Sequence, residues 1–196
     1  MRKKKIRGAC LALVFLLCGC SGSNQLKLSE MEADTLYVAN DGTLELANVE
    51  NFKEEYYSKS ELKDFIKESI KEYEGKEKNG TVKMEDFSVK DGIAKVLLTF
   101  DSADTYEEFQ GEELQFITSD QSFDNLVLPD QFVKASDGSK VDKEQVLKEK
   151  DLKYVIVNSA LDLRFGSDII YYADAVLTGD NTAQSSGEKP AVIIFK

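Results

Sequence analysis

Carboxylates are the most abundant reactive side chains of this chain, and histidine is absent. The 196 residues include 36 aspartates and glutamates, 25 lysines and arginines and no histidine. Because histidine is the usual general base and a common zinc and iron ligand, its absence excludes serine–histidine and cysteine–histidine dyads and histidine-based metal sites. Any chemistry would depend on carboxylates, lysine, tyrosine, serine or oxygen-ligated hard cations.

Two acidic stretches are candidates for calcium binding. They are residues 120–125, Asp-Gln-Ser-Phe-Asp-Asn, and Asp174 with Asp180-Asn181. A calcium loop needs alternating carboxylates, a glycine turn and a terminal bidentate glutamate, and neither stretch has this order. We therefore expect solvated turn residues and no metal site.

Two glutamate pairs, Glu107-Glu108 and Glu112-Glu113, are candidates for glycoside hydrolysis. That reaction needs two acids about 5–9 Å apart across a cleft, and no signature surrounds either pair. Ser60-Glu61-Leu62-Lys63 has the spacing of a serine–lysine site, but it falls in the first turn of a predicted helix, where a capping role explains Ser60 and Glu61 better. We expect no catalytic residue and no cofactor.

Two tyrosine pairs, Tyr56-Tyr57 and Tyr171-Tyr172, could present rings to a sugar or a peptide. Neighbouring residues in a strand point to opposite faces, so one exposed ring per pair is expected in any case. We predict that each pair supplies one core ring and one exposed ring.

All three cysteines, Cys10, Cys18 and Cys20, lie at the start of the chain. Basic residues between Arg2 and Arg7 precede an apolar run over residues 9–17. This run is too short to span a membrane, which takes about 20 residues, and it is typical of a signal peptide.

The stretch Leu17-Cys18-Gly19-Cys20 at its end resembles the lipobox of a bacterial lipoprotein signal. The resemblance implies that residues 1–19 are a signal peptide that is removed, and that Cys20 becomes the lipidated first residue. The alternative is a plain secretory signal in which Cys20 is incidental. In either case residues after 20 carry no thiol, so no disulfide framework and no cysteine nucleophile is expected.

The chain from Cys20 onward is strongly acidic. Five of the 25 basic residues precede Cys20 and all 36 acidic residues follow it, which leaves a formal net charge of −16. Such a domain is repelled by phosphate backbones and by anionic head groups. Nucleic acid is therefore excluded as a partner, and the lipid alone must provide attachment to the membrane.

Hydrophobic patterning predicts one α+β domain over residues 35–196, preceded by a flexible tether over residues 20–34. Asp-Gly pairs at 41–42, 91–92 and 137–138 predict tight turns, the first two joining strands 36–39 with 43–49 and 82–90 with 93–100. A capping box at Ser58 and Glu61 opens a helix over about 59–74, whose stripe includes Phe65. A buried Phe65 implies that truncation to alanine costs several kcal/mol.

Shorter elements complete the expectation. One or two short helices are expected, over 102–110 and from Asp142 to about Lys150. Further strands are expected over 113–118, 153–158, 160–165, 168–177 and 191–195, with a mobile segment over 179–190. The predicted architecture is one mostly antiparallel sheet of about six to eight strands with the 59–74 helix packed on one face.

The chain from Asp34 to Lys196 also resembles, in general pattern, uncharacterised surface lipoproteins of gut clostridia. The shared features include Leu36-Tyr37-Val38, Tyr56-Tyr57 before the Glu61 helix, and the closing Val192-Ile193-Ile194-Phe195-Lys196. The resemblance implies the fold class and no activity.

Together these observations indicate a non-catalytic binding or scaffolding domain held by lipid on the extracytoplasmic face of the cell membrane. Its partner would be an envelope protein, a glycan or a peptide. The alternatives are an envelope enzyme that acts on glycan or peptide through carboxylates, and an accessory subunit of an envelope protein complex.

We predict that Cys20→Ser releases the protein from membranes or leaves its precursor unprocessed, because the thiol that would carry the lipid is lost. Membrane fractionation with intact-mass measurement checks this. Unchanged processing and unchanged membrane retention of the variant would contradict the lipid anchor.

Overall fold

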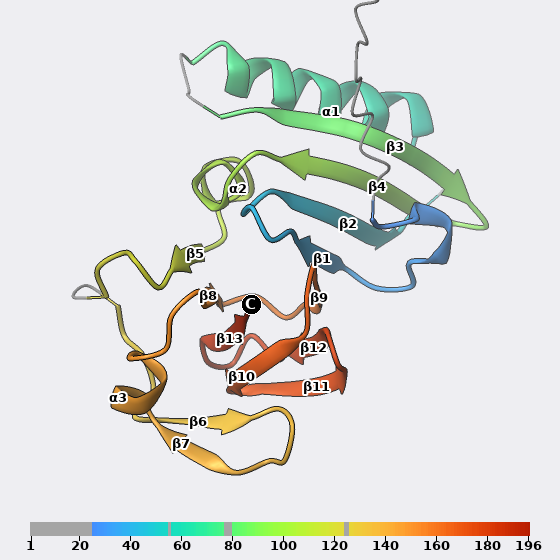
Figure 1. Cartoon of the computed structure of the whole chain (residues 1–196). Coiled ribbons are helices and arrows are strands. Elements are labelled where there is room, and N and C mark those ends of the chain that lie inside the picture. Colours follow the sequence, from blue (N-terminus) through green and yellow to red (C-terminus); the bar gives the residue numbers. More distant parts are fainter. Residues whose placement is uncertain (1–24, 55, 77–79, 124–125) are drawn as a thin grey trace, which may run out of the picture.

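The computed structural model describes residues 25–54, 56–76, 80–123 and 126–196. The predicted signal peptide, Cys20 and Asp124-Asn125 lie outside these residues. The described chain is α+β, with two mostly antiparallel sheets and three α-helices. In Figure 1, helix α1 (Lys59–Glu74) lies along one edge of the first sheet, and the second sheet with α3 (Lys143–Val146) forms the other end of the molecule.

Sheet A has seven strands and sheet B has six. In spatial order, the strands of sheet A are β11 (Ala175–Gly179), β12 (Thr182–Ser185), β9 (Asp162–Phe165), β1 (Thr35–Val38), β2 (Leu44–Asn51), β4 (Ile93–Phe100) and β3 (Val82–Lys90). Those of sheet B are β5 (Leu114–Thr118), β8 (Lys153–Val157), β13 (Ala191–Phe195), β10 (Ile169–Ala173), β6 (Gln131–Lys134) and β7 (Lys140–Asp142). Only the β1–β9 pair among these is parallel.

The hairpins form where the Asp-Gly pairs predict them. Strands β1 and β2 pair around Gly42, which has φ +87°, and β3 and β4 pair around Asp91 and Gly92, with φ +54° and +72°. Gly138, with φ +72°, lies between β6 and β7. Because left-handed backbone is inexpensive for glycine and tolerated by aspartate, these residues fix both the turns and the registers.

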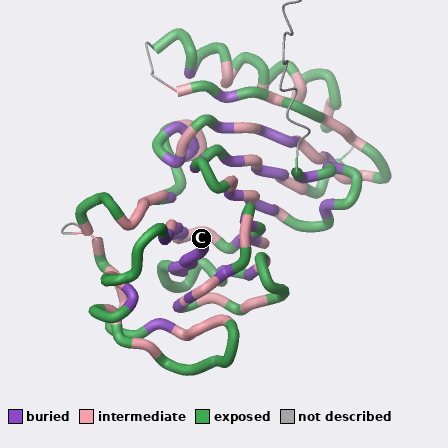
Figure 2. Tube along the Cα trace, viewed as in Figure 1, coloured by how far each residue is buried: buried purple, intermediate pink, exposed green. Residues whose placement is uncertain are grey.

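One apolar cluster fills the space between the two sheets. Leu36, Leu46 and Leu98 of sheet A and Val155 and Ile193 of sheet B belong to it, and all are buried. Figure 2 shows the buried residues gathered along the strands and the exposed ones on α1 and the turns. Helix α2 (Ala103–Gln110) closes the cluster with Tyr106, as predicted for the 102–110 segment.

The prediction of a single sheet is wrong, and Asp174 shows why. Residues 168–177 read as one strand, but Asp174 adopts φ +51° and turns the chain, so that β10 pairs in sheet B and β11 in sheet A. The segment predicted to be mobile, 179–190, contains β12, which pairs with both β11 and β9. The polar composition of this segment led to the prediction of mobility, but part of it is an ordered strand.

The prediction of a flexible tether is wrong for its described part, residues 25–34. Residues 28–30 form the short 3₁₀ helix η1 (Leu28–Glu30), and Leu26, Leu28 and Met31 pack on Ala47 and Leu97. This contact covers the outer face of sheet A, the face opposite the cluster between the sheets. The Glu45 carboxylate accepts hydrogen bonds from the N–H groups of Gln25 and Leu26 at 2.9 and 2.8 Å. Residues 25–34 therefore belong to the folded domain.

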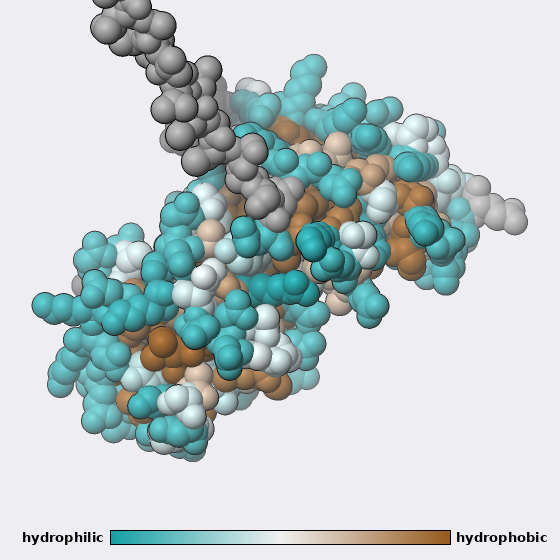
Figure 3. Space-filling model, turned by 45° about the vertical axis from the view of Figure 1, so that its right-hand side comes forward, coloured by the Kyte–Doolittle hydropathy of each residue, from teal (hydrophilic) through white to brown (hydrophobic). Residues whose placement is uncertain are grey.

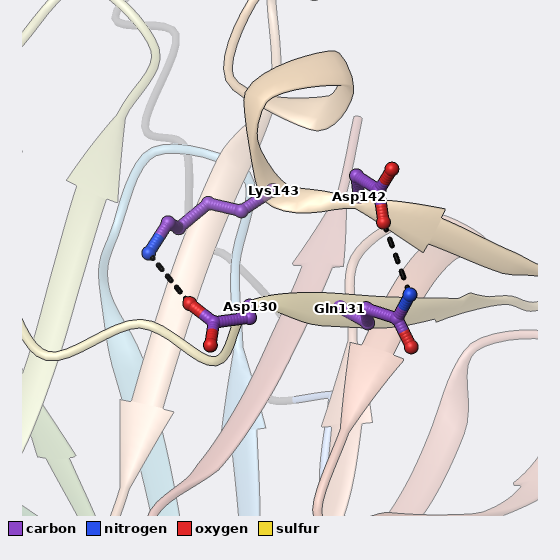
Figure 4. Close-up of polar contacts among 4 residues, drawn as sticks. All are labelled: Asp130, Gln131, Asp142 and Lys143. Carbon is purple, nitrogen blue, oxygen red and sulfur yellow. Dashed lines mark hydrogen bonds and ion pairs between the residues drawn. The ribbon is translucent and has the colours of Figure 1, made fainter.

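Helix α3 is shorter than the predicted helix to Lys150, and Asp142 does not cap it with its side chain. As Figure 4 shows, Asp142 instead accepts a hydrogen bond from Gln131 Nε2 at 3.0 Å, across the β6–β7 pair. Lys143 forms an ion pair with Asp130 at 3.2 Å. These side-chain contacts join the two strands of the hairpin. Because the Asp142 carboxylate is used there, it does not cap α3, and the uncapped helix is short.

Helix α1 has the predicted bounds, and the N–H of Glu61 donates to Ser58 Oγ at 3.4 Å. Its predicted apolar stripe is only partly buried. Tyr73 is buried and Ile66 and Ile70 are half-buried, but the Phe65 side chain is 67% exposed. The expectation of a buried Phe65 is wrong, because α1 rests on the edge strand β3 and the described residues leave the Phe65 part of its apolar face largely uncovered. Within the described residues, no helix is long and apolar enough to cross a membrane.

We predict that Leu28→Ala lowers the free energy of unfolding by about 2–4 kcal/mol, as for other buried leucines, whereas Phe65→Ala costs less than about 1 kcal/mol. Leu28 is 3% exposed and Phe65 is 67% exposed. Urea unfolding followed by circular dichroism measures both. Equal losses in the two variants would show that the burial of these side chains is not as described.

Candidate functional site

The main concave surface lies between α1 and the face of sheet A beneath it. Its first part has a volume of about 530 Å³ and is open to solvent. The floor is formed by Asn48 of β2 and by Ala94 and Val96 of β4, and the wall by Leu62 and Ile66 of α1. Phe87 of β3, which is half-buried, also lines this part. We call this surface the α1 groove.

The groove continues toward the C-terminal end of α1. A second hollow of about 430 Å³ shares Asn48, Phe65, Ile66 and Val96 with the first and ends at Tyr73. There the Tyr73 hydroxyl donates to Glu108 of α2 at 3.0 Å, and its ring meets Phe109 edge-on at 5.7 Å between centroids. The C-terminal end of α1 is therefore fastened to α2, while its N-terminal half is held mainly along β3.

Aromatic rings line the mouth of the α1 groove. Tyr57 packs against Phe52 and Tyr56, with centroid distances of 4.8 and 4.9 Å. The side chains of Tyr56, Tyr57 and Phe65 are 76%, 43% and 67% exposed. Three large exposed rings beside an apolar hollow are typical of a surface that binds something. Figure 3 shows hydrophobic surface left open in the half of the molecule that carries α1.

The charged groups of the groove are mostly carboxylates. Glu50 and Glu61 line its first part and Glu72 its second, and all three are exposed. Lys95 lines the floor, but its ammonium group donates to the carbonyl oxygen of Met31 in the segment that covers the outer face. Among the described lining residues, Lys76 at the far end is the other cation. The groove therefore offers an apolar floor and a predominantly negative rim.

The sequence pattern did not predict this site, because Phe65 has the spacing of a buried residue in the apolar stripe of the helix. A usable signal lies in β2, where the inward positions change from Leu44 and Leu46 to Asn48 and Glu50. Such a change along one face marks the point at which a strand leaves the core.

The acidic stretches considered for calcium are occupied by local contacts. Asp120 accepts from Thr118 Oγ1 at 2.5 Å, which lowers its pKa, and Asp174 lies 3.8 Å from Lys189. Across the described ranges, no group of three or more aspartate, glutamate or cysteine side chains is placed to hold a metal ion.

The glutamate pairs link elements to one another. Glu108 accepts from Tyr73, and Glu112 accepts from the hydroxyls of Tyr106 and Ser159 at 3.1 and 2.6 Å. Glu113 accepts from Asn158 Nδ2. These three carboxylates therefore act as hydrogen-bond acceptors. They join α2 and the residues before β5 to α1 and to the segment after β8.

The serine and lysine of the 60–63 stretch have different partners. Ser60 Oγ lies 3.0 Å from Ser58 Oγ, and Lys63 Nζ lies 5.8 Å from the centroid of the Phe87 ring. The lysine thus covers the outside of the groove wall, in a cation–π contact.

The tyrosine pairs behave differently from each other. Tyr171 is buried and its hydroxyl donates to Glu149 at 2.5 Å, while Tyr172 is half-buried. In contrast, Tyr56 and Tyr57 do not lie in a strand and both are exposed, so the prediction of one core ring in this pair is wrong. The pair that could present two rings is the one beside the α1 groove.

Comparison of the chain with protein-family models, with curated proteins and with solved structures finds no match.

We predict that alkaline pH destabilises the fold between pH 10 and about pH 12. The Glu149 hydrogen bond raises the pKa of Tyr171 to about 12, and burial raises that of Tyr154 to about 12, from the ordinary value of 10.0. The folded state therefore keeps protons that the unfolded chain loses, so this stabilisation is complete below pH 10 and disappears as the pH rises to about 12.

Urea unfolding across this pH range measures how steeply the free energy of unfolding falls as the pH rises. Tyr171→Phe removes one of the tyrosines with a raised pKa and should make the free energy of unfolding fall less steeply with pH; an unchanged slope would contradict the assignment.

Proposed function

We propose that this chain is a non-catalytic binding protein held by a lipid on Cys20 at the extracytoplasmic face of the cell membrane, with the α1 groove as its binding site. The observation that carries the binding role is the exposure of three aromatic rings along an apolar groove. Burying such rings is favourable by about 25 cal/mol per Å² of apolar surface, so a chain that leaves them in water retains a driving force for association.

The lipid anchor is supported by the residues at the start of the chain, the basic and apolar stretches that lead to Cys20. Residue 25 is the first described residue, and the fold holds it through Glu45. Five residues, 20–24, would then separate the proposed lipid from the domain.

The proposed occupant of the groove is an apolar peptide segment that carries basic side chains, within an envelope protein. Shape supports an elongated ligand, because the two hollows share four residues and follow α1. Charge supports basic side chains, because Glu50, Glu61 and Glu72 surround the apolar floor and the chain from Cys20 onward has a net charge of −16. An open groove with the Asn48 amide in its floor suits a peptide better than an acyl chain, which needs a closed apolar cavity.

The test uses the full chain in phosphatidylcholine vesicles, with protein-free vesicles as the blank. Two fluorescent twelve-residue probes have the same leucine pattern, one with lysine and one with glutamate at the remaining positions. We predict that the lysine probe binds at least about tenfold more tightly and that Phe65→Ser weakens its binding at least about fivefold, because an exposed ring that lines both hollows of the groove is lost.

Val176→Ser is the matched control, since Val176 is also exposed, at 65%, but lies on β11 at the opposite edge of sheet A. Equal affinity for both probes would overturn the charge preference. Equal effects of the Phe65 and Val176 substitutions would overturn the α1 groove as the binding site.

A further inference from the structure

The outer face of sheet A carries another hollow, separate from the α1 groove. Its volume is about 460 Å³, and it is lined by different kinds of side chain. It lies at the start of the described chain, since Gln25 forms part of its lining. Its centre is Arg164 of β9, the single arginine after residue 7. The Arg164 side chain is exposed, and its guanidinium has no hydrogen bond or ion pair within the part of the chain that the structure describes.

Strand pairing places the polar side chains of this hollow in two adjacent rows. Tyr37, Arg164 and Thr182 are direct neighbours on β1, β9 and β12, and Asp162 and Gln184 are neighbours in the next row. Side chains directly opposite each other in such pairs lie about 5 Å apart, so the rows form one continuous polar surface. We call it the Arg164 surface.

Several of these side chains are held in position by one another. Gln184 Nε2 donates to Asp162 at 2.8 Å, and the hydroxyls of Thr178 and Thr182 lie 2.9 Å apart. Asp162 retains a second carboxylate oxygen, and the guanidinium of Arg164 keeps its full fork of donors. The Asp162 carboxylate and the Thr182 hydroxyl are therefore held in position beside the guanidinium donors.

The electrostatics of the surface disfavour an anion. Its lining contains one carboxylate, Asp162, against one guanidinium. Burial raises the pKa of Tyr37, and the carboxylates of Glu45 and Asp41 raise it further, so these two acids add negative charge beside the surface. A neutral ligand with many hydroxyl groups matches such a surface, because adjacent hydroxyls can accept from the guanidinium fork and donate to the carboxylate.

We propose that the Arg164 surface binds a neutral glycan, with Arg164 and Asp162 holding neighbouring sugar hydroxyls and the Tyr37 side chain forming part of the wall. Five residues span at most about 18 Å, so a lipid on Cys20, as proposed above, would keep this surface among glycans close to the membrane. The surface lies on the opposite face of sheet A from the α1 groove, and the two sites are independent.

The test measures binding of maltotriose, cellotriose and chitotriose to the full chain in phosphatidylcholine vesicles by saturation-transfer difference NMR, with protein-free vesicles as the blank. At least one trisaccharide is expected to bind saturably. Arg164→Met should weaken it at least about tenfold, and Arg164→Lys should weaken it nearly as much, because an ammonium group keeps the charge but loses the planar fork. Lys83→Met, which removes an exposed cation from β3 at the other edge of the sheet, is the control and should change nothing.

The outcomes are distinct. Absence of binding by all three sugars, or equal binding by wild type and Arg164→Met, overturns the proposal. Saturable binding of inorganic phosphate that Arg164→Lys retains would assign an anion site and overturn it as well. Soluble sugars report on this surface whether or not Cys20 is lipidated, and the peptide assay reports on the α1 groove, so failure of one proposal is not confused with failure of the other.

Discussion

The apolar layer between the two sheets is the contact on which the rest of the structure depends. Strand β13 is buried along its whole length: Ile193 and Phe195 face sheet A, whereas Val192 and Ile194 face a second cluster beneath α3. The chain crosses repeatedly between the sheets, from β8 to β9, back to β10, over to β11 and back from β12 to β13. Neither sheet can therefore form its full set of strands without the other.

This arrangement also explains why one helix is left partly uncovered. Sheet B and α2 cover the part of sheet A that contains Leu36, Leu46 and Phe100. Toward β3, at the edge of that face, α1 takes the place of sheet B. The α1 groove is thus a consequence of how far sheet B extends, while the opposite face is divided between the packed segment 26–31 and the Arg164 surface.

Local signals in the sequence predicted local structure well. Ser58, Glu61 and Gly75 mark the ends of α1, and Asp91-Gly92 marks the β3–β4 turn, because capping and left-handed backbone depend on neighbouring residues alone. The division of the strands between two sheets could not be predicted, since it depends on a positive φ at Asp174 and on the long-range pairing of β9 with β1 in sheet A. Phe65 was misassigned for a related reason: periodicity shows which side of a helix is apolar, but the width of the layer that covers it is a tertiary property.

The attachment of residues 25 and 26 to Glu45 has a mechanical consequence. A pull applied through the start of the chain first meets two hydrogen bonds and the buried side chains of Leu26, Leu28 and Met31, and it reaches β2 through them. Strand β2 lies between β1 and β4, so the load enters the interior of sheet A and is divided between two ladders. A domain loaded in this way resists being peeled open strand by strand from an edge.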